Sequence, residues 1–219
     1  MSRIALIIGN PMPDSLDHAL AEAYRTAAVD GGATVRVIDL AIAVFEPVPT
    51  DRSELRVADR SDTERLGPAI QQMIETILWA DHLVFVHPVW WGTYPAVLKG
   101  FIDRVFLSGV AFQYRGQGSG WDKLLAGRTA RILVTMDAPS FFDRLKYRRA
   151  SEASLKNAVL WYCGVKTLGV TRFDKVRVST PERRARWIVD AAALGKKDAH
   201  RRRRNVRDVE QLADASPAA

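Results

Sequence analysis

Residues 9–17 combine side chains that could hold a phosphate. The amide of Asn10 and the hydroxyl of Ser15 lie between an apolar run and a helical pattern. A helix start presents free backbone N–H groups and the positive end of its dipole, which suit an anion. The segment has neither the G-x-G-x-x-G spacing of dinucleotide-binding folds nor a Walker A loop. The alternative is that Asp14 or Ser15 only caps the helix.

Residues 88–94 could bind a flat ring. Trp90 and Trp91 are adjacent, and neighbours in an extended segment point to opposite sides, so both cannot face the core. A flat aromatic ligand stacked on this loop would explain both rings and the turn-forming Gly92. The alternative is an aromatic plug or a contact between subunits.

Residues 136–143 form a third segment, which also directly follows an apolar run. In isolation it is explained as a helix entry capped by Asp137 or Ser140. Together, a phosphate site in the first segment and a ring site in the second fit a flavin mononucleotide moiety.

Apolar runs and helical patterns alternate along the chain, and they predict the elements that would position these loops. The expected strands are 4–8, 35–39, 82–87, 130–136 and 166–178, and the expected helices are 16–27, 67–79, 97–105, 145–163 and 181–194. This alternation predicts an α/β fold with a parallel sheet, in which ligands bind beyond the carboxyl ends of the strands. We expect a flavodoxin-like three-layer sandwich with a five-stranded parallel sheet of order 2-1-3-4-5. Residues 41–66 are expected to form a surface excursion and 108–127 a glycine-rich loop.

Composition excludes several classes of protein. The 219 residues are 47% hydrophobic and 26% charged, which argues against a disordered chain or a collagen. No run approaches the ~20 apolar residues of a membrane-spanning helix, and the first residues lack the cleavage site of a signal peptide. One cysteine, Cys163, permits no internal disulfide and no multi-cysteine zinc site, and the four scattered histidines give no metal site. A cytoplasmic location is the simplest fit.

The charge is concentrated toward one end. Residues 196–219 carry seven Lys or Arg against four acids, a substantial part of the net charge of +7. We expect a flavin-binding domain over 1–195 and a basic, disordered tail over 196–219. A nucleic-acid contact by the tail is the minority interpretation, because no base-reading motif is visible.

Three stretches resemble a known family. They are GNPMPDSLDHALAEAY at 9–24, ADHLVFVHPVWWGTYPAVLKGFIDRVF at 80–106 and, more loosely, TMDAPSFFDRLKY at 135–147 with WYCGVKTLGVTRF at 161–173. The chain resembles the NAD(P)H dehydrogenase (quinone) family of flavodoxin-like fold, which includes DT-diaphorase and bacterial quinone reductases. The resemblance covers about residues 3–195.

The resemblance implies an oxidoreductase that contains FAD or FMN. NADPH or NADH would give a hydride to flavin N5, and a quinone or similar electron-poor aromatic would then accept it. It also implies a homodimer. No catalytic side chain is assigned, because flavin N5 carries the chemistry. No metal, no membrane insertion and no nucleic acid are expected.

The resemblance also assigns residues to the cofactor, position by position. Those nearest the phosphate would be Asn10, Ser15, Leu16 and Asp17. Those along the flavin ring would be Pro88, Val89, Trp90 and Trp91, with backbone N–H groups at its polar edge. The third loop would contribute Met136, Asp137, Ala138 and Pro139. Tyr94 and Phe112 are candidates for the wall of the substrate cavity.

Some features depart from the family, and others stay open. Asp17 stands where the family often has Asn, and a carboxylate beside a phosphate is repulsive unless it points away. Asp137 replaces part of the Thr-Thr-Gly-Gly run of DT-diaphorase. The choice between NADPH and NADH is open, since four arginines are candidates for a 2′-phosphate contact: Arg115, Arg128, Arg144 and Arg148. The alternatives are an ancillary flavin-binding subunit and a flavodoxin-like electron carrier; the basic charge argues against a carrier.

Overall fold

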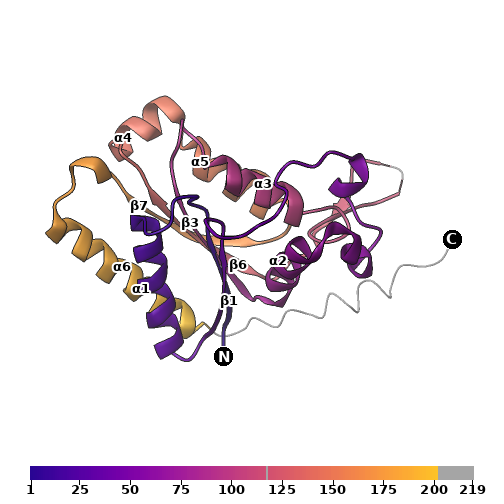
Figure 1. The fold of residues 1–219 in the computed structure, drawn as a ribbon, viewed down its shortest axis with the longest axis horizontal. Coiled ribbons are helices and arrows are strands. Elements are labelled where there is room, and N and C mark those ends of the chain that lie inside the picture. Colours follow the sequence, from indigo (N-terminus) through magenta and orange to yellow (C-terminus); the bar gives the residue numbers. More distant parts are fainter. Residues whose placement is uncertain (117, 202–219) are drawn as a thin grey trace.

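A five-stranded parallel sheet forms the centre of the molecule (Figure 1). The computed structural model describes residues 1–116 and 118–201. The strands are β1 (Arg3–Ile8), β2 (Thr34–Asp39), β3 (His82–Pro88), β6 (Thr129–Thr135) and β7 (Lys166–Phe173). Their order across the sheet is β2-β1-β3-β6-β7, and every pair is parallel. Counted in chain order, this confirms the predicted 2-1-3-4-5 arrangement.

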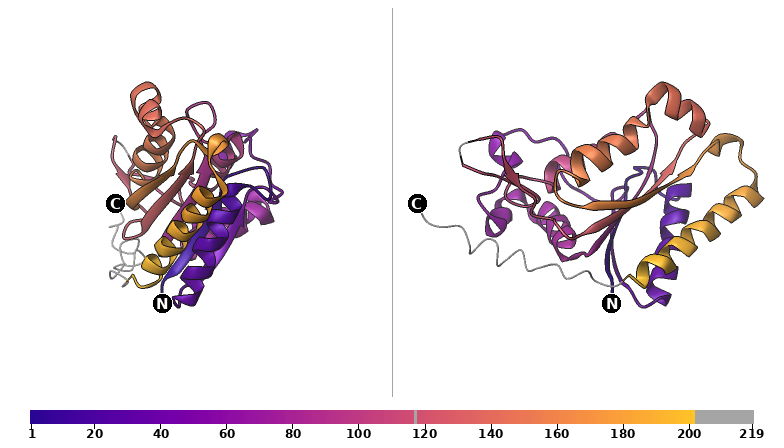
Figure 2. Two further views of the ribbon diagram at one scale, coloured as in Figure 1. Left: turned by 90° about the vertical axis from the view of Figure 1, so that its left-hand side faces the viewer. Right: turned by 180° about the vertical axis from the view of Figure 1, so that it is seen from behind.

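Helices cover both faces of the sheet, which makes three layers (Figure 2). One face carries α1 (Leu16–Asp30) and α6 (Pro181–Ala199), which pack side by side. The other carries α2 (Pro68–Trp79), α3 (Ala96–Val105) and the segment 140–160. The central strand β3 is buried on both faces, as expected of a continuous apolar run in a parallel sheet.

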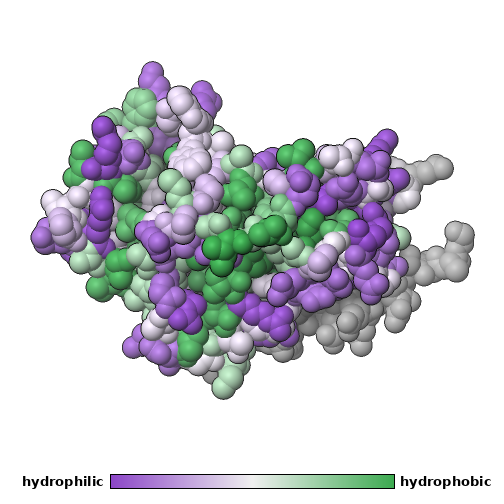
Figure 3. Space-filling model, in the orientation of Figure 1, coloured by the Kyte–Doolittle hydropathy of each residue, from purple (hydrophilic) through white to green (hydrophobic). Residues whose placement is uncertain are grey.

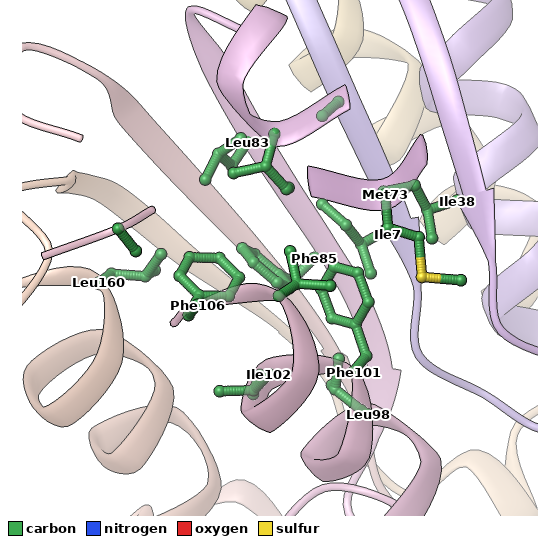
Figure 4. Packing of buried hydrophobic residues seen from close by; sticks show 14 of the residues in the cluster. Ile7, Ile38, Met73, Leu83, Phe85, Leu98, Phe101, Ile102, Phe106 and Leu160 are labelled. Carbon is green, nitrogen blue, oxygen red and sulfur yellow. The ribbon is translucent and has the colours of Figure 1, made fainter. Parts of the chain in front are cut away.

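The larger apolar core lies between the sheet and the second helical layer (Figure 4). Phe85 from β3 meets Phe106, and Phe101 from α3 also packs against Phe106. Alternate residues of β3, such as Val84 and Val86, point to the opposite face and pack against α1 and α6. The period-two alternation of a strand therefore divides the interior into two cores.

Three expectations about individual elements need correction. The helix predicted over 145–163 is broken into α4 (Ser140–Phe142), the π-helical turn η3 (Asp143–Tyr147), α5 (Ala150–Ala153) and the π-helical turn η4 (Ser154–Leu160). The glycine-rich loop holds a short antiparallel pair, β4 (Gln113–Tyr114) and β5 (Trp121–Asp122). The fifth strand ends at Phe173 and is followed by a 3-10 turn, η5 (Val176–Val178), instead of continuing to 178.

The excursion over 41–66 contains two 3-10 helices, η1 (Arg52–Leu55) and η2 (Arg60–Leu66). Figure 3 shows apolar side chains gathered in the middle of one face of the molecule. The excursion contributes several exposed apolar residues, including Ile42 and Val44. Val57 and Leu66 are buried against the core, so the excursion is anchored and not a free loop.

A buried cluster of charged and polar side chains anchors α6 near the amino ends of the strands. Asp198 accepts hydrogen bonds from Tyr24 at 2.8 Å and from Nη2 of Arg131 at 2.8 Å, and Nε2 of His82 lies 3.3 Å away. These contacts hold the pKa of the Asp198 carboxyl well below its usual range, against the opposing effect of its burial. Helix α6 continues to Ala199, beyond the predicted boundary at 195; the rest of the predicted tail, from 202, lies outside the described residues.

Within residues 1–116 and 118–201, no helix is both long and apolar enough to cross a membrane. The same residues contain no group of three or more metal-ligating side chains.

Candidate functional site at the carboxyl edge of the sheet

The three loops singled out in the sequence meet at one edge of the sheet. They follow β1, β3 and β6, which lie in adjacent or near-adjacent positions. Backbone hydrogen bonds join them: Gly9 donates to the carbonyl of Val86 at 2.7 Å, and Val89 donates to the carbonyl of Thr135 at 2.8 Å. The structure thus brings residues 9–17, 88–94 and 136–143 together, as the parallel topology requires.

A buried hydrogen-bond cluster organises the first loop. Nδ2 of Asn10 donates to Oδ2 of Asp17 at 2.8 Å, and Oδ1 of Asn10 accepts from the N–H of Met12 at 3.0 Å. The hydroxyl of Thr135, at the end of β6, donates to Oδ1 of Asp17 at 2.9 Å. Asn10 and Asp17 are both buried, so they fix the shape of the loop from inside.

The carboxyl of Asp17 points into this cluster, where donors from Asn10 and Thr135 surround it. Burial raises its pKa to about 6, while the two hydrogen bonds and nearby His18 act in the opposite direction. Two features reduce the repulsion between Asp17 and an anionic ligand. The carboxyl is turned inward, and with a pKa of about 6 it carries a proton in a fraction of the protein molecules near neutral pH.

Ser15 occupies the N-cap position of α1 without capping it. Its hydroxyl lies 2.8 Å from Nδ1 of His18, whose Nε2 lies 3.1 Å from Oδ1 of Asp39. The side chain of Ser15 makes no hydrogen bond to the helix backbone, so the alternative that Ser15 serves as an ordinary cap does not describe this loop. The first-turn N–H groups, at Leu16 and Asp17, are left without a side-chain cap, as an anion site at a helix start requires.

The second loop contains a tight turn centred on Trp91 and Gly92. Trp90 and Thr93 exchange two backbone hydrogen bonds, at 2.8 and 3.0 Å. The central residues Trp91 and Gly92 have φ angles of 51° and 77°, and positive φ at both positions is the requirement of a type I′ turn. The turn holds the side chain of Trp91 fully in solvent, while Trp90 is 38% exposed.

This turn decides which N–H groups are available to a ligand. Those of Val89 and Trp90 are used within the protein, and Pro88 has none. The N–H groups of Trp91 and Gly92 form no hydrogen bond with any described residue. If a flavin binds here as the resemblance implies, Trp91 and Gly92 are residues of this loop whose N–H groups are free to contact the polar edge of its ring.

The third loop is held by its neighbours in β7 and beyond. Met136 is buried, and its N–H donates to the carbonyl of Phe173 at 3.0 Å. Asp137 is exposed, and Oδ1 accepts from the N–H of Arg177 at 2.9 Å. Ala138 and Pro139 are half-buried, and Pro139 precedes the short helix α4. Asp137 therefore does not cap α4, which follows it, but accepts from a backbone N–H of η5, after β7.

The two proposed wall residues differ in position. Tyr94 is buried, its hydroxyl lies 3.1 Å from Oγ of Ser154, and its ring meets His87 edge-on at 5.9 Å. Phe112 is half-buried and packs between Tyr114 and Tyr162. Burial lowers the pKa of His87 to about 4, so this imidazole is neutral at neutral pH.

Two residues at this edge were missed from the sequence. Thr135 is the donor that orients Asp17. Tyr147 packs against the second loop, since a Cβ added to Gly92 would lie 3.2 Å from Cδ1 of the Tyr147 ring. No local signal marked Tyr147, because its segment looked like the face of a regular helix.

The arrangement suits one kind of ligand. Uncapped N–H groups at the start of α1 fit an anion, the N–H groups of Trp91 and Gly92 fit an electron-rich edge, and Trp90 and Trp91 offer aromatic surface. These donors fit the phosphate and the flat ring of a flavin nucleotide.

Known proteins are similar to this chain in sequence and in fold. A sequence-family model described as flavodoxin-like fold matches residues 2–194. An uncharacterized NAD(P)H oxidoreductase of Escherichia coli (strain K12) is 31% identical over 171 residues, which cover 77% of this chain and 82% of that protein.

Solved structures share the fold. An NAD(P)H:quinone oxidoreductase from Methanothermobacter marburgensis has a TM-score of 0.73 at 22% identity, covering 92% of this chain and 98% of its own. An FMN-dependent NADH-azoreductase from Bacillus anthracis str. Ames Ancestor, solved in complex with FMN, has a TM-score of 0.68 at 17% identity and covers 91% and 98% of the two chains.

Proposed function

This chain belongs to the flavodoxin-like fold family, and on that premise we propose that it is a flavin-dependent NAD(P)H:quinone-type oxidoreductase. The bound flavin would supply two-electron chemistry, accepting a hydride from NAD(P)H and passing it to a quinone or a similar electron-poor aromatic. The printed names of the relatives, which are NAD(P)H oxidoreductases and quinone reductases, support this activity. An FMN-bound neighbour supports the cofactor.

One observation carries the proposal. Two sets of unengaged backbone donors, at the start of α1 and at Trp91–Gly92, lie on loops that share one edge of the sheet. A flavin nucleotide could use both sets, with its phosphate at the helix start and the polar edge of its ring at the turn. The phosphate would accept from Ser15 and from the N–H groups of Leu16 and Asp17.

The chain's own residues would then do two things at the polar end of the site. Asn10, Asp17 and Thr135 keep the phosphate loop in shape. The N–H groups of Trp91 and Gly92 would donate to the polar edge of a bound flavin, because fixed donors stabilise the negative charge of a reduced flavin without reorganising.

The aromatic residues would shape the space around the ring. Pro88, Val89, Trp90 and Trp91 lie along it. The substrate cavity would be lined by the third loop (Met136–Pro139), by Tyr94 and by Phe112. In such a cavity a quinone can stack on the flavin once the oxidised nicotinamide has left.

We also propose that the chain works as a cytoplasmic homodimer. Aromatic side chains gather around the β4–β5 hairpin: Phe112 packs with Tyr114 and Tyr162, and Trp121 stacks on Tyr162 at 4.4 Å. More than half of Tyr114 is exposed, as is more than half of Trp161. A second copy covering this cluster would bury that apolar surface. Light scattering on the purified protein would test the mass.

Absorption spectroscopy tests the central proposal. The purified protein, incubated with FAD or FMN and desalted, should keep a flavin spectrum that bleaches with anaerobic NADPH or NADH and recovers with benzoquinone. Trp91→Ala should weaken flavin binding without changing the urea midpoint, because this side chain is fully exposed. Flavin retention without turnover would favour an ancillary subunit instead, and a protein that binds neither flavin would overturn the assignment.

A further inference from the structure

A groove of about 470 Å³ lies between the edge strand β7 and the broken helical segment beside it. Figure 1 labels β7 and α5, and residues of both elements line the groove. Charged and polar side chains dominate its lining, which includes Arg148, Arg149, Glu152, Lys156, Thr167 and Arg172. Neither the fold nor the proposed flavin site requires this groove.

The lining has an excess of positive charge. Glu152 is its one carboxylate; it accepts from Nε of Arg172 at 2.6 Å and from a second nitrogen of the same guanidinium. Nε of Arg149 lies 3.9 Å from Glu152. Arg148 and Lys156 are exposed and form no ion pair with any described residue. Arg172 and Arg149 both contact Glu152, so Arg148 and Lys156 are the two lining cations that no carboxylate neutralises among the described residues.

Two donors in the lining lack a hydrogen-bond partner. Nε of Arg149 and the hydroxyl of Thr167 are buried atoms without a hydrogen bond to any described residue. A buried donor left unpaired costs about 1–3 kcal/mol, so such groups call for an explanation. Both side chains line the groove, so an oxyanion bound there would become an acceptor for these donors once the side chains turn toward it.

The backbone at the groove is strained. Arg148 and Arg149 have φ angles of 51° and 54°, so two consecutive non-glycine residues adopt the left-handed conformation. Each costs about 1–2 kcal/mol, and such strain tends to cluster at ligand sites. The reversal ends η3 and begins α5, which places both arginines at the mouth of the groove.

The groove begins next to the proposed flavin ring site. Tyr147, the residue before Arg148, packs against Gly92 in the Trp90–Thr93 turn. A dinucleotide whose nicotinamide lay at the flavin could therefore extend along the surface toward Arg148.

The structure also separates the four arginines that the sequence left as candidates. Arg115 is paired with Asp122 at 2.8 Å. Arg128 donates to the carbonyls of Leu78 and Ala80, near the opposite edge of the sheet. Arg144 is exposed but does not line the groove, and Arg148 does.

We propose that this groove binds the 2′-phosphate of NADPH, with Arg148 and Lys156 supplying charge and Arg149 and Thr167 supplying hydrogen bonds. The inference rests on the proposed function, because it takes NAD(P)H to be the reductant. A phosphate monoester is a dianion, and charge-assisted hydrogen bonds are the strong ones. NADH carries no phosphate at this position, so the groove would make the chain prefer NADPH.

Calorimetry on the flavin-loaded chain tests the site without turnover. Adenosine 2′,5′-bisphosphate should bind at least tenfold more tightly than adenosine 5′-monophosphate. The double variant Arg148→Gln/Lys156→Gln should lose that advantage. Arg144→Gln, which removes a neighbouring exposed cation outside the groove, is the matched control and should keep it. Inorganic phosphate serves as a third probe.

Steady-state kinetics supply the second measurement. In the double variant, KM for NADPH should rise about tenfold, while kcat and the KM for NADH stay unchanged. The inference is overturned if the two nucleotides bind equally, if inorganic phosphate binds as tightly as the bisphosphate, or if Arg144→Gln has the same effect. None of these outcomes depends on flavin reduction, so the proposed function would stand. Conversely, a chain that binds the bisphosphate but whose flavin is not reduced would overturn the proposed function while the groove remained a phosphate-binding site.

Discussion

Asn10 donates a 2.8 Å hydrogen bond to the buried carboxyl of Asp17, which also accepts from Thr135. One acidic side chain thus joins the end of β1, the end of β6 and the first turn of α1. The carboxyl lies inside the loop that it shapes. This position gives the chain a pH dependence that can be measured.

Asp17→Asn should flatten the pH dependence of stability. The folded-state pKa of about 6 lies above the ordinary value of 3.8, so between pH 4 and 6 the folded state binds more protons than the unfolded state. The contribution of Asp17 to the free energy of unfolding therefore falls as pH rises through this window, by about 2–3 kcal/mol in all. The variant, whose amide can pair with both neighbours, should lack this decline.

Urea denaturation at pH 4, 5 and 6.5 measures the effect. Asp14→Asn changes an exposed carboxyl in the same loop and should leave the pH profile of the parent chain intact. If Asp17→Asn and the parent decline in parallel, Asp17 does not titrate as described.

Gly92→Ala should destabilise the turn on which the second loop depends. The φ angle of 77° disfavours any side chain, and the new Cβ would lie 3.2 Å from the Tyr147 ring. We expect a loss of about 1–2 kcal/mol in the free energy of unfolding. Gly116→Ala is the control, because nothing lies within 4 Å of a Cβ there. Equal urea midpoints for the two variants would show that the turn tolerates the change.

Asp198→Ala should be one of the most damaging substitutions in the chain. It leaves the buried guanidinium of Arg131 and the buried hydroxyl of Tyr24 without their shared acceptor. Removing one partner of a buried ion pair costs about 3–5 kcal/mol. Asp190→Ala, at an exposed position of the same helix, should cost less than about 0.5 kcal/mol. Thermal denaturation of both variants compares them, and similar melting temperatures would argue against the anchoring role.

Cys163 should resist thiol reagents in the folded protein. It is 2% exposed, and burial raises the pKa of its thiol to about 12, so thiolate is scarce at neutral pH. A chromogenic disulfide should titrate one thiol in urea and none in buffer within minutes. Rapid labelling in buffer would mean that η4 opens readily.

The five parallel strands were predictable because buried parallel strands are continuous apolar runs and their crossovers are long enough for helices. Their order came from the flavodoxin arrangement, which the expected flavin loops indicated. The inward turn of Asp17 was not predictable, since its partner Thr135 is 118 residues away in the sequence. The break at Arg148 and Arg149 was also hidden, because arginine is an ordinary helix former and nothing local marks a left-handed conformation. Two-residue strands such as β4 and β5 are too short for a periodic signal.

The Asp198 cluster also has a consequence for synthesis of the chain. Tyr24 and Arg131 belong to the first two thirds of the sequence, yet their shared acceptor is made only at residue 198. Until then a nascent sheet would have to bury an arginine without its counter-charge. We expect the emerging polypeptide to stay loosely structured, and sensitive to proteases, until α6 has left the ribosome; the completed domain would then close as a unit.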